Sequence, residues 1–78
     1  MNIKILGMGC AKCIKLYDFA KEAVEELGID ATVEKVEDIK GIMNYGVMAT
    51  PALVIDEKVI FAGKTASKKE LVEIISKY

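Results

Sequence analysis

The chain of 78 residues carries 11 basic and 12 acidic side chains, a net charge of −1, and 53% of its residues are hydrophobic. This length fits one domain, and the apolar content is high enough for a single core, which argues against a disordered chain. All the basic residues are lysine, and histidine is absent. Nucleic-acid binding is therefore not expected, and the commonest general base and metal ligand is missing.

No stretch reaches the roughly 18–20 consecutive apolar residues that a membrane-spanning helix needs. Residues 1–7 are strand-like, include Lys4, and have neither a long apolar core nor a small-residue cleavage site. They are therefore not predicted to be a secretory signal. We expect a cytoplasmic protein without a membrane partner. In a reducing cytoplasm, two cysteines seldom form a purely structural bridge.

The first half of the chain predicts a strand, a long helix and a second strand. Residues 3–6 are short and β-branched-rich, and Gly7 ends this strand. Residues 12–27 follow a helical period, and Gly28 is placed where a left-handed cap ends a helix. Residues 29–36 return to a strand pattern. The apolar stripe of the helix consists of Cys13, Leu16, Tyr17, Ala20, Ala23, Val24 and Leu27.

The second half predicts a short helix and a hairpin. Asp38 is a suitable cap for a helix that carries Ile39, Ile42 and Met43 and is closed by Gly46. Gly41 within this helix weakens it by roughly 1 kcal/mol. Two apolar runs, 52–55 and 59–62, are separated by Asp56–Glu57–Lys58, a pattern typical of a β-hairpin.

A capping-box pattern predicts the last helix. Ser67 and Glu70 are three residues apart and precede an apolar stripe. The members of this stripe are Leu71, Ile74, Ile75 and Tyr78. The predicted order is β-α-β-α-β-β-α, an α/β fold in which helices flank a four-stranded mixed central sheet. It forms a single domain over residues 1–78.

Cys10 and Cys13 are three residues apart, at the join between the first strand and the long helix. A dithiol at this spacing near a βαβ pattern is typical of a redox motif. As a structural staple the pair is poor, since a four-residue ring contributes only about 2 kcal/mol through loop entropy. Cys13 suits an inert core position because it lies on the buried stripe, whereas Cys10 precedes the helix.

The position of Cys10 suggests a nucleophile. Unpaired backbone N–H groups and the helix dipole favour an anion at a helix N-terminus, and Lys12 adds a nearby positive charge. Lowering a thiol pKa from about 8.5 toward 7 raises its thiolate fraction at neutral pH from a few per cent to near half. We therefore expect Cys10 to attack a disulfide and Cys13 to resolve the mixed disulfide.

Metal binding is the alternative function. Met8, Cys10 and Cys13 have the spacing of soft ligands, and two thiolates are sufficient for Cu(I). The run GMGCAKC, residues 7–13, resembles the motif of heavy-metal-associated domains, so on the motif alone a redox protein and a copper carrier are nearly equal. Zinc is disfavoured because two cysteines without histidine fill only half of a tetrahedral site.

The rest of the chain separates the two functions. Heavy-metal-associated domains follow the order βαββαβ and end in a strand, whereas this chain is predicted to end in a helix. Residues 44–55, NYGVMATPALVI, are similar to the thioredoxin segment in which a Tyr-Gly-aliphatic turn leads to a cis-proline at the start of a central strand. Gly63 matches the glycine that follows the last strand there. Nearly the whole chain resembles a small prokaryotic thioredoxin-like family of redox-active disulfide, or glutaredoxin-like, proteins.

This resemblance implies a thioredoxin-like fold and a protein disulfide oxidoreductase that uses the Cys10–Cys13 disulfide, without another cofactor or a metal. It implies a cis bond at Thr50–Pro51, which docks an extended substrate and excludes metal. Gly9, Ala11 and Lys12 are expected to tune the dithiol. The expected partners are disulfide-containing proteins and a thioredoxin-reductase-type electron donor. The role would lie in electron transport and cell redox homeostasis, performed by a monomer.

Two departures from the family pattern limit what the resemblance assigns. Thioredoxins carry a buried acid six residues before the first cysteine, where this chain has Lys4, so no proton acceptor for Cys13 is identified. The Thr50–Pro51 turn lacks the valine of glutaredoxins, and residues 63–65 lack their acid, so the glutathione site is not matched. The remaining conspicuous side chains are expected to pack, with the methionines in the core and the tyrosines half buried. They are Met43, Met48, Tyr17 and Tyr45.

Overall fold

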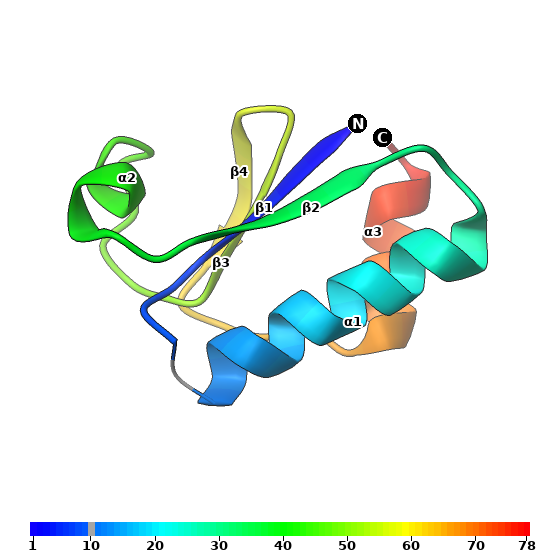
Figure 1. Cartoon of the computed structure of the whole chain (residues 1–78), viewed down its shortest axis with the longest axis horizontal. Coiled ribbons are helices and arrows are strands. Elements are labelled where there is room, and N and C mark those ends of the chain that lie inside the picture. Colours follow the sequence, from blue (N-terminus) through cyan, green and yellow to red (C-terminus); the bar gives the residue numbers. More distant parts are fainter. Residues whose placement is uncertain (10) are drawn as a thin grey trace.

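The computed structural model describes residues 1–9 and 11–78, and within them the chain alternates strands and helices around one sheet (Figure 1). The elements are β1 (Asn2–Leu6), α1 (Ala11–Leu27), β2 (Thr32–Val36), α2 (Ile39–Met43), β3 (Ala52–Ile55), β4 (Lys58–Ala62) and α3 (Lys68–Ser76). The predicted order and the thioredoxin-like α/β fold are confirmed. A helix lies between β2 and β3, and another follows β4, which agrees with the thioredoxin arrangement and not with the βαββαβ order of heavy-metal-associated domains.

The sheet has the strand order β2-β1-β3-β4 and mixed directions. β1 pairs with β2 in parallel and with β3 antiparallel, so that Ile3 lies opposite both Val33 and Ile55. β3 and β4 form the antiparallel hairpin expected from the sequence. All four residues of β3 are buried, because this strand has a neighbour on each side and helices on both faces. β1 and β3 are thus the centre of the fold.

Both long helices cover the same face of the sheet, side by side (Figure 1). Side chains pointing to this face from β1 and β3 pack against the apolar stripes of α1 and α3 to form the main core. Its fully or nearly fully buried members are Ile3, Ile5, Leu16, Ala20, Ala23, Leu53, Ile55, Ala66, Leu71 and Ile75. The sequence predicted helices on the faces of the sheet, and the structure places α1 and α3 together on one of them.

The opposite face carries a smaller cluster beneath α2. Leu6, Ala52 and Val54 project to this side, where Ile42 and Val47 cover them. A helix of five residues covers little area, so this face is only partly closed. The sheet therefore has one well-covered face and one open face.

Gly41 has a packing role that the sequence did not reveal. A Cβ at this position would lie 2.8 Å from both Val36 Cγ1 and Asp38 Oδ1. The absent side chain lets α2 approach the end of β2, and the Asp38 carboxylate accepts a hydrogen bond from the Gly41 backbone N–H at 2.9 Å. The predicted cap is confirmed, and close packing explains a glycine that is unfavourable for the helix itself.

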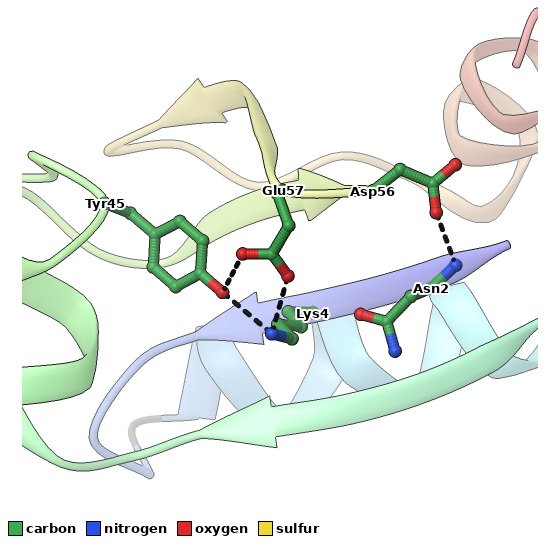
Figure 2. Close-up of polar contacts among 5 residues, drawn as sticks. All are labelled: Asn2, Lys4, Tyr45, Asp56 and Glu57. Atoms are coloured by element: carbon green, nitrogen blue, oxygen red, sulfur yellow. Dashed lines mark hydrogen bonds and ion pairs between the residues drawn. The ribbon is translucent and has the colours of Figure 1, made fainter.

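The hairpin between β3 and β4 turns through two residues with positive φ, Asp56 at 48° and Glu57 at 70°. Two-residue hairpin loops favour this left-handed geometry because it matches the twist of the strands. The Asp56 carboxylate accepts a hydrogen bond of 2.8 Å from the Asn2 backbone N–H, which joins the turn to β1 (Figure 2). The left-handed turn therefore contains no glycine, and a side-chain hydrogen bond attaches it to β1.

The capping box at the start of α3 is confirmed. The Glu70 backbone N–H donates to Ser67 Oγ at 3.2 Å, and the Ser67 backbone N–H donates to Glu70 Oε1 at 3.4 Å. Leu71 and Ile75 are buried as predicted, whereas Tyr78 lies beyond the helix end and is exposed. Within residues 1–9 and 11–78, no helix combines the length and apolar character needed to cross a bilayer.

Candidate thiol site

Cys13 lies in the first turn of α1 and is buried against the sheet, with 5% of its surface exposed. Its burial follows from the helical stripe, because Leu16 and Ala20 on the same face enter the main core. Lys12 is on the exposed side of this turn. Cys10, the predicted nucleophile, lies outside the described residues, so its place at the helix N-terminus stays a prediction.

Gly7 lies directly against the Cys13 sulfur. A Cβ at Gly7 would overlap Cys13 Sγ, and it would lie 2.9 Å from Cys13 Cβ and 4.0 Å from Thr50 Cβ. Gly7 is itself fixed by a hydrogen bond of 3.0 Å from its backbone N–H to Val36 O. The sequence assigned this glycine only to a strand end. The structure shows that it makes room for the sulfur and lies near both Cys13 and Thr50.

The predicted substrate-docking turn lies on the other side of Gly7. The Thr50–Pro51 peptide bond is cis, with Thr50 exposed and Pro51 buried. Pro51 O accepts a hydrogen bond of 3.0 Å from the Gly63 backbone N–H. The structure thus brings together Cys13 and Thr50–Pro51, which are far apart in the sequence.

A pocket of about 260 Å³ opens beside Cys13, and we call it the thiol pocket. It is lined by Ile5, Gly7, Gly9, Cys13, Ile14, Lys35 and Glu37. Lys35 and Glu37 bring one charge of each sign from the end of β2. Glu37 Oε2 lies only 3.5 Å from where a Cβ on Gly9 would be. A carboxylate is therefore placed beside the backbone that leads into the C-x-x-C motif.

A second hollow, of about 180 Å³, lies on the open face of the sheet, and we call it the methionine groove. It is lined by Met8, Ile39, Ile42, Met43, Val47, Met48 and Thr50. The prediction that Met43 and Met48 fill the core is wrong, because they are 64% and 98% exposed. The short α2 turns only Ile42 inward, so its other apolar side chains stay at the surface. Met8 lines this groove, and its neighbours Gly7 and Gly9 line the thiol pocket.

Lys4 takes part in a hydrogen-bonded cluster, which we call the Lys4–Tyr45–Glu57 network (Figure 2). Lys4 Nζ donates to Tyr45 Oη and to Glu57 Oε1, both at 2.8 Å, and Tyr45 Oη donates to Glu57 Oε2 at 2.9 Å. The hydrogen bonds that Lys4 donates to Glu57 and Tyr45 raise its pKa well above its usual range. Lys4 and then Tyr45 lower the pKa of Glu57. Tyr45 is half buried here, as predicted.

Comparison with known proteins identifies the family. The profile of the thioredoxin domain matches residues 1–76 of this chain. The chain belongs to the thioredoxin family. It is 45% identical over 76 residues to a thioredoxin of Methanothermobacter thermautotrophicus, covering 97% of this chain and 99% of that protein. It is 43% identical to a thioredoxin of Methanocaldococcus jannaschii over 97% of this chain and 87% of that one. The prediction of a small prokaryotic thioredoxin-like protein is confirmed, and the chain is a thioredoxin-like redox protein.

The structure shows what Lys4 does where thioredoxins carry a buried acid. Ile3 and Ile5 point to the face that holds α1 and Cys13, so the alternation of β1 directs Lys4 to the open face. Lys4 is therefore occupied by Tyr45 and Glu57 and is turned away from Cys13. Within the described residues, Glu37 is the carboxylate that shares a pocket with Cys13.

Proposed function

We propose that this thioredoxin-like protein is a thiol–disulfide oxidoreductase that exchanges disulfides through Cys10 and Cys13. One observation carries the proposal: Cys13 lines a pocket, and a Cβ built on Gly7 would meet both its sulfur and the Thr50 Cβ. A sulfur so placed at the start of a helix, next to an exposed backbone turn, suits a reaction in which an extended chain brings a disulfide to the helix end. Membership in the thioredoxin family supports the same chemistry.

The proposed reaction transfers two electrons from the dithiol to the substrate. The Cys10 thiolate attacks one sulfur of the substrate disulfide, forms a mixed disulfide and releases the other sulfur as a thiolate. Cys13 then loses its proton and attacks Cys10 Sγ, which closes the Cys10–Cys13 disulfide and releases the second substrate thiolate. Both released thiolates take up protons. The protein ends oxidised and the substrate reduced, and a thioredoxin-reductase-type donor returns the electrons.

The neighbouring residues have supporting roles in this proposal. Lys12 supplies an exposed positive charge in the first helical turn, which favours a thiolate. Gly9 and Ala11 flank Cys10 with little bulk, so they leave its sulfur accessible to a protein disulfide. Thr50 offers backbone groups to an extended substrate, and the buried Pro51 follows it through the cis bond.

The proposed partners follow from this chemistry. The substrates are disulfide-containing proteins, and a monomer acting in the cytoplasm fits a role in electron transport and redox homeostasis. Glutathione is not proposed as a dedicated substrate, since neither the Thr50–Pro51 turn nor residues 63–65 match the glutaredoxin pattern. The redox-active group is the Cys10–Cys13 disulfide itself, without metal or organic cofactor.

Reduction of insulin disulfides by the purified protein tests the proposal. We expect Cys10→Ser to abolish the activity and Cys13→Ser to accumulate a mixed disulfide visible as an adduct in intact mass spectrometry. A redox titration of the wild-type protein should give one two-electron step between about −180 and −300 mV, the span of known oxidoreductases. Full activity of Cys10→Ser, or a dithiol that stays reduced at every potential, would refute the proposed function.

A further inference from the structure

The Lys4–Tyr45–Glu57 network joins three segments that are distant in sequence. Lys4 belongs to the central strand β1, Tyr45 follows α2, and Glu57 lies in the turn between β3 and β4 (Figure 2). Lys4 is less exposed than its ion-pair partner, with 21% of its side chain accessible against 65% for Glu57. The lysine is thus anchored in the sheet, and it also lies 5.5 Å from the centre of the Tyr45 ring. Tyr45 is held by both its hydroxyl and its ring.

The segment that Tyr45 belongs to, residues 44–51, has few other attachments to the sheet. The backbone N–H groups of Asn44, Tyr45 and Gly46 donate to carbonyls of α2, so these bonds close the helix without joining it to a strand. Within the described part of the chain, no other side chain of this segment hydrogen-bonds to the sheet. Val47 is buried in the smaller cluster, whereas Met48 is almost fully exposed. Tyr45 therefore supplies the side-chain attachment of the segment, and the hydrogen bond from the Gly63 backbone N–H to Pro51 O holds its far end.

This same segment forms one wall of the methionine groove and ends at the candidate site. Val47, Met48 and Thr50 line the groove together with Met8. Thr50 then lies next to Gly7, across from the Cys13 sulfur. Any displacement of the segment would change both the shape of the groove and the position of the Thr50 backbone relative to the sulfur.

We propose that Tyr45 is a positioning residue for protein substrates. Its hydroxyl, which is hydrogen-bonded to Lys4 and Glu57, fixes residues 44–51, and these residues form one wall of the methionine groove. The proposal rests on the proposed disulfide exchange. The groove binds an apolar stretch of the substrate chain beside the disulfide, since its lining side chains are thioether and aliphatic groups apart from Thr50. Exposed methionines suit such a role, because their flexible side chains adapt to different apolar partners.

Removing the hydroxyl should weaken substrate docking and leave the chemistry intact. If the segment leaves its docked position for part of the time, the apparent KM rises by the inverse of the docked fraction. A single hydrogen bond corresponds to about a fivefold change in such an equilibrium, so we expect a KM for insulin up to about fivefold higher in Tyr45→Phe. A small disulfide such as 2-hydroxyethyl disulfide has no chain to place in the groove, and its rate constant should not change.

The experiment compares Tyr45→Phe and Glu57→Gln with two matched controls. Asp56→Asn alters the neighbouring residue of the same turn, and Glu26→Gln removes the ion pair between Glu26 and Lys68, whose atoms lie 3.3 Å apart. For each variant we would measure kcat and KM with insulin, the rate constant with 2-hydroxyethyl disulfide, the reduction potential and the thermal midpoint. Tyr45→Phe and Glu57→Gln should raise the KM for insulin without changing the rate constant with 2-hydroxyethyl disulfide or the reduction potential. The kinetic constants of both controls should match those of the wild type.

Two results would overturn the inference. An unchanged KM for insulin in both network variants would show that the network does not position the groove. An equal loss of rate with insulin and with the small disulfide, or a shifted reduction potential, would show that Tyr45 affects the dithiol or the whole fold. Failure of the proposed function is distinguishable, because the wild-type protein would then reduce neither substrate.

Discussion

Close contact between Gly7 and Cys13 makes residue 7 a sensitive position. A methyl group there would occupy the place of the sulfur, so either α1 or the end of β1 must shift. Overpacking of this kind typically costs about 1–3 kcal/mol, and here it would also displace a reactive atom.

We expect Gly7→Ala to lower the free energy of unfolding by about 1–3 kcal/mol and to change the rate at which iodoacetamide alkylates the reduced protein. Gly28→Ala is the matched control. Gly28 differs from Gly7 in having a positive φ of 63°, which strains an alanine there, but no atom lies within 4 Å of its missing Cβ. This control should lose stability without any change in alkylation. A wild-type alkylation rate in Gly7→Ala would show that the contact does not affect the thiols.

Glu37 has an electrostatic effect that can be tested by its sign. Its carboxylate lines the thiol pocket, and a negative charge there opposes formation of a thiolate. Glu37→Gln should therefore speed alkylation at pH 7 by up to about twofold at low ionic strength, and the gain should shrink in salt because the site is exposed. Glu34→Gln is the control, since Glu34 lies on β2 opposite Lys4 and points to the other face of the sheet from Lys35 and the thiol pocket. Slower alkylation in Glu37→Gln would instead indicate that Glu37 accepts a proton from a thiol.

At the scale of elements, the Lys4–Tyr45–Glu57 network predicts a pH dependence of stability. The pKa of Glu57 is lowered by folding, so its contribution is present above the ordinary glutamate pKa and is lost as pH falls through the lowered value. The thermal midpoint of the wild type should therefore drop more than that of Glu57→Gln between about pH 5 and pH 3. Parallel curves for the two proteins, measured by circular dichroism at low salt, would contradict this. Lys4, with its raised pKa, contributes below about pH 10.5 and loses its contribution only at higher pH.

The capping box of α3 makes a separate prediction. Ser67→Ala should lower the free energy of unfolding by about 1 kcal/mol, because the Glu70 backbone N–H loses its acceptor. Ser76→Ala removes a hydroxyl of the same helix that bonds only to the Glu73 carbonyl near the C-terminal end. Urea unfolding of the two variants should show the larger loss for Ser67→Ala, and equal losses would argue against a role of the cap.

At the scale of the molecule, local patterns predicted the elements and long-range contacts decided the site. The periodic stripe of α1, the cap of α3 and the hairpin each depend on neighbouring residues, so the sequence identified them. The contact of Gly7 with Cys13 and the bonds of Lys4 with Tyr45 and Glu57 join residues from different elements. Local sequence patterns do not predict contacts between residues of different elements. The predicted proximity of Thr50–Pro51 to the thiols came from family resemblance, which carries long-range information.

The two faces of the sheet have different roles (Figure 1). The face covered by α1 and α3 holds the main core and contributes most to stability, whereas the face that the short α2 leaves partly open carries the proposed docking groove. Leu71 is fully buried in the main core, whereas Ile42 is buried in the smaller cluster and borders the methionine groove. Large-to-small changes cost about 2–5 kcal/mol, most where the cavity cannot collapse. We therefore expect Leu71→Ala near the top of that range and Ile42→Ala near the bottom.

We expect the variant that loses less stability, Ile42→Ala, to show the larger change in KM for insulin. Ile42→Ala removes part of the groove wall, so its KM for insulin should rise while its rate with 2-hydroxyethyl disulfide stays at the wild-type value. Leu71→Ala should leave both constants unchanged below its thermal midpoint, because α3 takes no part in lining the groove or the thiol pocket among the described residues. Urea unfolding and steady-state kinetics on the two variants decide the matter. A larger stability loss in Ile42→Ala, or a raised KM in Leu71→Ala, would show that the two faces are not separated in this way.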